Sequence, residues 1–241
     1  MDVTVERVEF EAVQPMRELY RHEAGCQIIH YSALPRKLAD PWQIAVDGRP
    51  AGYAGIWNKY DPGRLMEFYL LPHLRAEAAP IFRQLLQTSG ATEMEAQTNL
   101  PLMLLMFLDC VPAISVENVL FYDALTTSLP SPGGTFRRAA TDGEKEHGEW
   151  LIEVNGESAA WGGALYHYNE PYGDIFMATA EAHRRRGYGS YLVQEVKRET
   201  WQRGKTPSAR CNADNLASRR TLQKAGMWPC GRLLTGKVKS T

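Results

Sequence analysis

Cysteine is scarce in this sequence, and metal-binding motifs are missing. The 241 residues include four cysteines, Cys26, Cys110, Cys211 and Cys230. They are scattered, without a Cys-x-x-Cys pair or a histidine at metal-ligand spacing, so we expect no metal cofactor. Disulfide frameworks belong mainly to small secreted domains, and we therefore expect these thiols to be reduced and buried in a cytoplasmic protein.

Segments suited to a membrane or to secretion are also missing. The longest apolar stretch, residues 100–114, is interrupted by Asp109 and two prolines, and it is too short to span a bilayer. The N-terminal MDVTVERVEFEAV is acidic and lacks the basic and apolar regions of a signal peptide. The sequence therefore predicts a cytoplasmic protein without a membrane partner.

Net charge is small but unevenly distributed. The chain has 27 Lys and Arg against 28 Asp and Glu. Residues 1–132 contain 10 basic and 16 acidic side chains, whereas residues 133–241 contain 17 and 12. The acidic front half and the lack of a broad basic surface argue against a nucleic-acid partner. An anionic ligand would be expected in the back half, and chance variation on solvated surfaces is an equal alternative.

A pattern that occurs twice divides the chain. WQIAVDGRPAGYAGIW at residues 42–57 aligns without gaps with WLIEVNGESAAWGGAL at residues 150–165. Alternating apolar residues around Asp-Gly or Asn-Gly predict a β-hairpin. The linker-like LPSPGG at residues 129–134 lies between the copies. Their spacing is too long for a solenoid repeat and fits a duplicated small domain.

Each hairpin is followed by the same order of elements, strand, helix, strand and helix. In the front half these lie at residues 64–71, 76–89, 92–98 and from Asn99, and in the back half at 174–180, 188–203, 207–213 and from Asn215. Both asparagines suit a helix N-cap, and Gly226 suits the end of the last helix. Two further helical segments, residues 10–22 and 32–38, precede the front hairpin. The sequence thus predicts two homologous α/β lobes, residues 1–130 and 131–241.

A basic turn precedes the helix predicted at residues 188–203. Arg184, Arg185 and Arg186 run directly into Gly187-Tyr188-Gly189. Glycine lets backbone amides approach a ligand, and the first amides of a helix are unpaired at the positive end of its dipole. Basic side chains are unfavourable there unless an anion is bound. The turn therefore predicts a site for an anion such as a pyrophosphate.

Two common phosphate-binding motifs do not explain this turn. The sequence has no GxxxxGK[ST], which excludes a P-loop, and no GxGxxG of a Rossmann unit. Arg-x-x-Gly-x-Gly after a strand instead resembles the acyl-CoA signature of the GNAT superfamily of N-acetyltransferases. Further along the chain, ARCNADNLASRRTLQKAGM at residues 209–227 resembles the next motif of that superfamily.

The resemblance covers residues 149–233 and implies both a fold and an activity. The fold would be two GNAT-like lobes, each a mixed, mostly antiparallel twisted sheet flanked by helices. The activity would be transfer of an acetyl group from acetyl-CoA to a primary amine by direct attack. A polyamine, an antibiotic, an amino acid and a protein N-terminus all remain possible acceptors, and both a monomer and a homodimer remain possible assemblies.

The resemblance also implies roles for particular residues. The strand that ends at Met177, Ala178 and Thr179 would splay from its neighbour and pair with the pantetheine arm, and one of its amides would polarise the thioester carbonyl. Asn215 and Ser218 would contact the cofactor beside the thioester. The pyrophosphate would lie on the amides of Arg184, Arg185, Arg186, Gly187, Tyr188, Gly189 and Ser190.

The catalytic groups depart from the family pattern. Leu222 occupies the position at which many members have a tyrosine that protonates the leaving thiolate. Tyr166, Tyr168 or a water would then serve as the acid, and Asp174 lies near the position of the general base. Further candidates for the acceptor pocket, at the end of the second hairpin, are His167, Tyr168 and Glu170.

The front lobe departs further. Its segment in the position of the phosphate loop, LPHLRAEAAP at residues 71–80, contains no glycine, and Cys110 replaces the closing glycine. We expect this lobe to bind no CoA and to complete the sheet or form a wall of the acceptor site. Two other functions remain: a catalytically silent acyl-CoA sensor or docking module, which the missing tyrosine favours, and a transferase with an aminoacyl-tRNA donor, which the lack of a broad basic surface disfavours.

Overall fold

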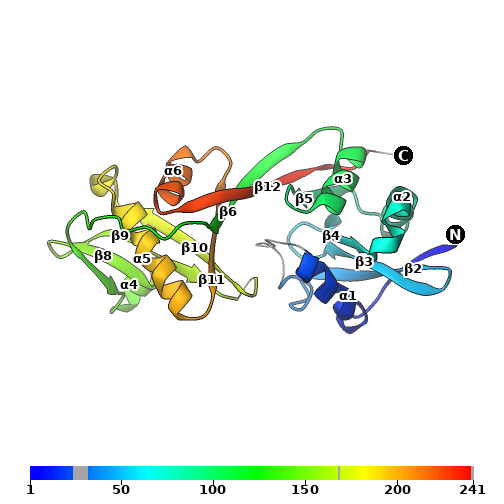
Figure 1. The fold of residues 1–241 in the computed structure, drawn as a ribbon, viewed down its shortest axis with the longest axis horizontal. Coiled ribbons are helices and arrows are strands. Elements are labelled where there is room, and N and C mark those ends of the chain that lie inside the picture. The colour runs from blue at the N-terminus through cyan, green and yellow to red at the C-terminus, as the bar shows by residue number, and fades with distance from the viewer. Residues whose placement is uncertain (24–31, 168, 240–241) are drawn as a thin grey trace. The chain divides into compact units, whose positions relative to one another are not determined.

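The computed structural model describes residues 1–23, 32–167 and 169–239 and divides the chain into two compact units (Figure 1). The N-terminal unit contains Met1–Glu117 and the C-terminal residues from Gly231. The C-terminal unit contains Asn118–Cys230. Each unit is a mixed, mostly antiparallel sheet flanked by helices, as the resemblance implied.

The N-terminal unit has one parallel strand pair, β4 with β5, among the strands that the structure describes. Its strand order is β1 (Val3–Arg7), β2 (Ala39–Val46), β3 (Arg49–Trp57), β4 (Arg64–Leu70), β5 (Glu93–Gln97) and the part of β12 (Met227–Lys237) that begins at Gly231. Its helices are α1 (Phe10–Glu23), the 3-10 helix η1 (Pro72–Glu77), α2 (Ala78–Ser89) and α3 (Pro101–Cys110).

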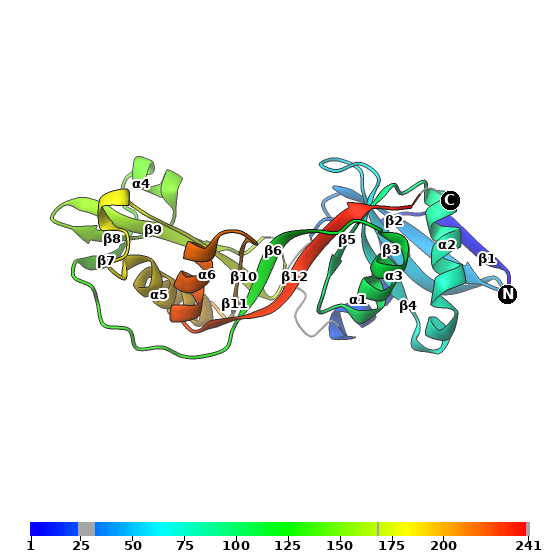
Figure 2. The ribbon, with the colours of Figure 1, turned by 90° about the horizontal axis from the view of Figure 1, so that it is seen from above.

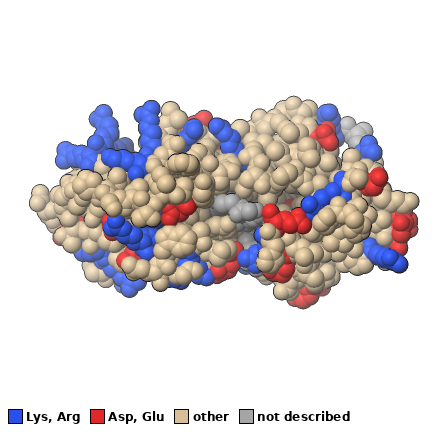
Figure 3. All heavy atoms as spheres, in the orientation of Figure 1, with Lys and Arg blue, Asp and Glu red and all other residues tan. Residues whose placement is uncertain are grey.

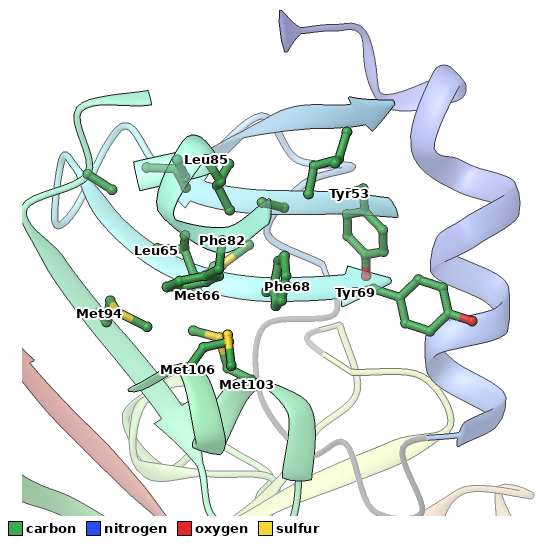
Figure 4. Packing of buried hydrophobic residues seen from close by; sticks show 14 of the residues in the cluster. Tyr53, Leu65, Met66, Phe68, Tyr69, Phe82, Leu85, Met94, Met103 and Met106 are labelled. Atoms are coloured by element: carbon green, nitrogen blue, oxygen red, sulfur yellow. The ribbon is translucent and has the colours of Figure 1, made fainter. Parts of the chain in front are cut away.

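Aromatic and sulfur-containing side chains form much of the core of this unit (Figure 4). The rings of Phe68 and Phe82 meet edge to face with centroids 4.7 Å apart. An ion pair is also buried here. Arg17 of α1 donates two hydrogen bonds to the carboxylate of Glu67 of β4, at 3.0 and 2.9 Å. Tyr53 donates a third hydrogen bond to the same carboxylate. The buried charge is therefore paired and well satisfied, as burial requires.

The C-terminal unit has the strand order β6 (Ser115–Asp123, from Asn118 onward), β11 (Thr206–Asn212), β10 (Tyr172–Thr179), β9 (Glu157–Leu165), β8 (Trp150–Val154) and β7 (Thr135–Arg138). Its helices are α4 (Asp142–His147), the 3-10 helix η2 (Glu181–His183), α5 (Tyr188–Gln202) and α6 (Leu216–Lys224). Helix α5, gold in Figures 1 and 2, packs on β8, β9 and β10 through apolar residues such as Leu192 and Val196.

Both predicted hairpins are present. Asp47 and Gly48 join β2 to β3 with φ of 49° and 74°, and Asn155 and Gly156 join β8 to β9 with φ of 52° and 83°. Positive φ at both central residues is typical of the type I′ turn that matches the twist of paired strands. The predicted helices at residues 10–22 and 188–203 are also present, as α1 and α5.

The prediction of a helix at residues 32–38 was wrong, because the structure has a series of turns in this segment. Pro35 has no amide hydrogen to donate, and Lys37 has a φ of 56°, in the left-handed region. Leu38 N–H then donates to Ala33 O at 2.9 Å and closes the turn. The helical spacing of apolar residues here reflects the burial of Leu34 and Leu38 rather than a helix.

Strand pairing divides the chain differently from the predicted boundary after residue 130. β12, red in Figure 2, comes from the end of the chain and pairs with β5 of the N-terminal unit, with Leu233 opposite Gln97. β6 precedes that boundary and pairs with β11 of the C-terminal unit, with Tyr122 opposite Ser208. The backbone groups of β5 and β11 need these partners, and no local pattern in the sequence indicates which strand provides them.

The cysteines are less uniform than expected. Cys211 is buried, Cys110 and Cys230 are half-buried, and Cys26 lies outside the described residues. In the part of the chain that the structure describes, no helix combines the length and the apolar character needed to cross a membrane.

Candidate functional site

The candidate site lies where β10 and β11 separate. The two strands pair in parallel from Tyr172 opposite Thr206 to Ile175 opposite Ala209. Beyond that point β10 continues along β9 to Thr179, and β11 continues along β6 to Asn212. A wedge therefore opens beside the last residues of β10, which is the splay expected for this strand.

The backbone of β10 presents polar groups to the wedge. The carbonyl oxygen of Phe176 faces Gly162 of β9, and Ala180 N–H donates to Ala159 of the same strand at 3.0 Å. Backbone groups of successive residues in a strand point to opposite neighbours. The N–H and C=O of Met177 and Thr179 consequently point toward the wedge.

The turn between η2 and α5 is built for backbone approach. Arg185 and Gly187 have φ of 61° and 94°, so two residues of the turn lie in the left-handed region. Gly187 is the N-cap of α5, and no side chain caps this helix end. The first amides of α5 therefore keep their hydrogen-bonding capacity at the positive end of the helix dipole.

The wedge and this turn open into one cavity of about 760 Å³. All the predicted cofactor-binding residues line it except Arg186. Five further residues that the sequence motifs did not indicate also line this cavity: His183, Ala217, Arg220, Thr221 and Lys224. Four of these lie on α6 at spacings of three, four and seven residues. One face of that helix therefore lines the cavity, and helical periodicity counted from Ser218 is the signal that could have found them.

The wall is strongly basic. Arg184 and Arg185 of the turn and Arg220 and Lys224 of α6 line the same cavity. Lys224 Nζ lies 4.0 Å from the position that a Cβ on Gly187 would occupy, so its charge is close to the uncapped helix end. Figure 3 shows Lys and Arg side chains gathered over the end of this unit that carries η2 and α6. An anion at the start of α5 would thus meet both backbone donors and positive charge.

Gly189 holds three elements close together. A Cβ at this position would lie 3.0 Å from Thr179 Oγ1 of β10 and 3.2 Å from Thr221 Cγ2 of α6. These distances are shorter than ordinary carbon contacts of about 3.5–4.0 Å. The missing side chain therefore lets the start of α5 sit directly against the end of β10 and the face of α6.

Asn215 has the structural role that the sequence predicted. Its side chain accepts a hydrogen bond from Ser218 N–H at 3.0 Å and caps α6. Gly226, with a φ of 85°, follows the C-cap of the same helix. Both Asn215 and Ser218 line the large cavity and also a second cavity beside it, so the start of α6 separates the two spaces.

The second cavity has a volume of about 310 Å³ and contains Asp174. This side chain is 9% exposed, and Arg210 Nε lies 3.2 Å from its Oδ2. Burial raises the pKa of Asp174 above its ordinary value, while the positive charge of Arg210 partly opposes the rise. A carboxyl group of this kind can take up a proton from a neighbouring ligand.

The other predicted catalytic and acceptor residues that the structure describes line neither cavity. Tyr166 packs on α5, where its hydroxyl lies 3.4 Å from Thr200 Oγ1 and its ring is stacked by Arg203. Glu170 pairs with Lys205, His167 is exposed, and Tyr168 lies outside the described residues. Leu222 is buried and lines the second cavity, to which it contributes an aliphatic side chain.

The N-terminal unit repeats the wedge without the basic, glycine-containing turn. β4 and β5 pair only at Arg64 with Glu93 and at Leu65 with Met94 in the described residues. The turn that follows forms η1, and the N-cap of α2 is Glu77, whose carboxylate would repel an anion there. Arg75 is ion-paired with Glu23 at 2.5 Å. The cavity beside these residues has a volume of about 240 Å³. Its size and charge differ clearly from those of the large basic cavity.

No cluster of three or more His, Cys, Asp or Glu side chains arranged to hold a metal ion occurs within residues 1–23, 32–167 and 169–239. The two cavities of the C-terminal unit offer backbone amides, basic side chains and the Asp174 carboxyl group to a ligand.

Sequence models of known families match both halves of the chain. A model described as "Acetyltransferase (GNAT) family" matches residues 119–227, and one described as "Acetyltransferase (GNAT) domain" matches residues 10–124. A sequence search of curated proteins gave no match.

Solved structures share the fold over nearly the whole chain. A GNAT-family acetyltransferase from Colwellia psychrerythraea is 14% identical, with a TM-score of 0.79 over 98% of this chain and 100% of that one. A GNAT protein from Sphaerobacter thermophilus is also 14% identical, with a TM-score of 0.63 over 99% and 96%. A tandem GNAT protein from the clavulanic acid biosynthesis pathway is 11% identical, with a TM-score of 0.58 over the full length of both chains.

Two family matches in tandem agree with the duplicated hairpins, the two units and the arrangement of the wedge, turn and helix in the C-terminal unit. The chain belongs to the GNAT acetyltransferases, an acyl-transfer family, as a tandem member with one GNAT lobe in each half.

Proposed function

We propose that this chain is an N-acetyltransferase that moves an acetyl group from acetyl-CoA to a primary amine at one site, in the C-terminal lobe. One observation carries the proposal: the polar backbone of β10 and the uncapped start of α5 face the same basic cavity. A thioester with a long polar arm and a pyrophosphate matches both features at once. A free phosphate would use only the turn.

The residues of the turn would hold the phosphates. Amides at the start of α5 donate hydrogen bonds, and Arg184, Arg185 and Lys224 add positive charge. The pantetheine arm of the donor would then extend β10 as a strand, because Met177 and Thr179 point backbone groups into the wedge. A backbone N–H in this wedge would donate to the thioester carbonyl oxygen and stabilise the negative charge that develops on it.

The second cavity would hold the amine. It shares Met177, Asn215 and Ser218 with the large cavity, so an amine there lies next to the end of the pantetheine arm. Asp174 would accept a proton from the ammonium group, and the neutral amine would attack the carbonyl carbon. Placing the two reactants side by side supplies much of the rate enhancement.

The leaving thiolate does not require a protein acid. A thiol has a pKa of about 8.5, so the thiolate is a good leaving group near neutral pH and water can protonate it. Leu222 in place of a tyrosine is therefore compatible with transfer. The same replacement is the observation that favours a second function, in which the lobe binds acyl-CoA without turnover.

Release of free thiol from acetyl-CoA tests the proposal when it is measured with a panel of amines that differ in charge and size. Thiol release that depends on the amine, with the acetylated product found by mass spectrometry, is the expected result. CoA binding measured by calorimetry without thiol release for any amine would support the silent sensor instead. Absence of CoA binding would overturn both functions.

A further inference from the structure

The second cavity in the C-terminal lobe carries information about the acceptor. Its walls come from β9, β10, β11 and α6, and all of these elements belong to this lobe. The rung of Ile175 opposite Ala209 ends the pairing of β10 with β11, so the cavity lies at the base of the wedge. A molecule bound there would have direct access to a thioester at Met177.

Two side chains of opposite charge lie in this cavity on neighbouring strands. Asp174 comes from β10 and Arg210 from β11, with Arg210 Nε 3.2 Å from Asp174 Oδ2. The carboxylate is 9% exposed and the guanidinium 35%, so the negative charge lies deeper. These two side chains already pair with each other, and a ligand that carries both a carboxylate and an ammonium group can add a partner of opposite charge to each of them in one small space.

The other walls and the size of the cavity restrict the ligand further. Leu165, Phe176 and Leu222 give it apolar surfaces. Its volume of about 310 Å³ is at the lower end of the range of small-molecule sites, about 300–1,000 Å³. A polyamine or a polycationic antibiotic would bring additional positive charge beside Arg210, which is unfavourable. A small zwitterion with an apolar side chain matches the charge, the size and the walls.

We propose that the acceptor is a free α-amino acid with an apolar side chain, whose carboxylate binds Arg210 and whose amino group lies beside Asp174. This assignment rests on the proposed acetyl transfer. Arg210 is a substrate-binding residue, and its contact places the nitrogen of the amino acid next to the carboxyl group that takes its proton.

The transfer is balanced without any further reactant. The ammonium gives one proton to Asp174, and the neutral nitrogen forms a C–N bond to the acetyl carbonyl carbon. The C–S bond breaks with its electron pair on sulfur, and the thiolate takes up a proton. The nitrogen loses a second proton, so that the products are the N-acetyl amino acid and CoA, with one proton released to solvent.

A matched set of ligands tests the role of the carboxylate by binding and by turnover. L-leucine, leucinamide and 3-methylbutylamine share the same side chain and amine, and only leucine has a carboxylate. Calorimetry on the CoA-saturated protein and thiol release from acetyl-CoA would be measured for each. We expect leucine to bind, and to show kcat/KM at least about tenfold higher than the other two, since hydrogen bonds to a charged group are strong.

Arg210→Gln should remove that preference while CoA affinity stays unchanged, and Arg210→Lys should keep part of it because the charge remains. Arg198→Gln is the matched control, since this arginine is 47% exposed on α5 and pairs with Glu195. The control should keep the full preference for leucine. Melting temperatures measured for all three variants show that each is folded.

The outcomes separate the acceptor assignment from the proposed function. Equal binding and turnover of leucinamide and leucine by the wild-type protein would overturn the assignment, and so would a preference that survives Arg210→Gln. The assignment would also be overturned if none of the three ligands binds and a different amine stimulates thiol release from acetyl-CoA. That result would still support the proposed acetyltransferase activity. Leucine binding without thiol release would instead support the zwitterion site and overturn acetyl transfer.

Discussion

Lys197 Nζ lies 2.5 Å from Asp123 Oδ1, and the two side chains are only 5% and 9% exposed. The same ammonium donates to the carbonyl oxygens of Leu125 and Ala225, at 2.8 and 2.7 Å. Asp123 ends β6, and Ala225 is the C-cap of α6. The ammonium group of Lys197 on α5 therefore connects β6, the strand that pairs with β11, to α6, the helix that lines the basic cavity.

Lys197→Met should lower the free energy of unfolding by about 3–5 kcal/mol, because it leaves a buried carboxylate without its ion-pair partner. Urea denaturation followed by circular dichroism measures this change. Lys205→Met is the matched control. Its pair with Glu170 is half-exposed, so the expected cost is below about 1 kcal/mol. Equal losses in the two variants would contradict the role of the buried pair.

Gly187→Glu should abolish CoA binding, because it places a carboxylate at the uncapped end of α5 and strains a backbone with φ of 94°. Gly204→Glu is a suitable control, since Gly204 also has positive φ, 69°, and open space around it, at the other end of α5. The control should show the same backbone strain with unchanged CoA affinity. Calorimetric titration with CoA on both folded variants decides whether the turn is the phosphate site.

Gly189→Ala should weaken CoA binding about tenfold and cost about 1–3 kcal/mol of stability, because the added methyl meets Thr179 and Thr221. Adding Thr221→Ser removes the methyl group at 3.2 Å and should restore part of both losses. Gly143→Ala, at an open position in α4, should leave CoA affinity unchanged. A variant of Gly189 that binds CoA normally would show that close packing here is not needed by the site.

The proposed role of Asp174 predicts that activity depends on pH with a definite sign. The proton acceptor must be ionised, so kcat/KM should rise with pH through a pKa above the ordinary value of about 3.9. Arg210 and Cys211 face the same cavity, and only the charge of Arg210 lowers this pKa. Asp174→Asn should remove this limb of the profile and lower kcat about 10²- to 10⁴-fold, with CoA affinity kept.

The same raised pKa predicts the sign of a stability effect. Between the unfolded and the folded pKa the folded protein holds the proton more tightly, so the free energy of unfolding falls as pH rises through this window. Stability from this group is therefore present at low pH and lost above the folded pKa. Denaturation curves at several pH values should show a smaller decrease for Asp174→Asn than for the wild-type protein. An identical decrease would contradict the assignment of a raised pKa to Asp174.

We expect the N-terminal lobe to bind no CoA, so the chain should bind one CoA molecule. For the same reason His73→Ala should leave the CoA affinity unchanged. His73 is exposed on η1, in the N-terminal segment that corresponds to the basic, glycine-containing turn of the C-terminal lobe. That lobe has Glu77 at the start of α2 and an ion pair at Arg75 in place of the glycines and arginines of the C-terminal lobe. A calorimetric stoichiometry of two would overturn this conclusion.

Much of the candidate site could be predicted because its signals are local. The basic turn consists of neighbouring residues, the arginines at 184–186 followed by Gly187 and Gly189. Its backbone conformation depends on the φ angles of these residues themselves. Asn215 caps its own helix three residues along the chain. The contribution of Arg220, Thr221 and Lys224 follows from helical periodicity once α6 is placed against the turn. The contact of Arg210 with Asp174 could not be predicted, because it depends on which strand lies beside β10.

The sequence by itself determined the two hairpins, the basic turn, the capped helix and the duplication, since each depends on backbone preferences within a few residues. Only the tertiary structure decided that β6 pairs with β11 of the C-terminal unit and that β12 pairs with β5 of the N-terminal unit. It also decided that Asp174 of β10 meets Arg210 of β11. Strand partners are selected by burial and hydrogen bonding across long separations, and a linear pattern carries no record of that selection.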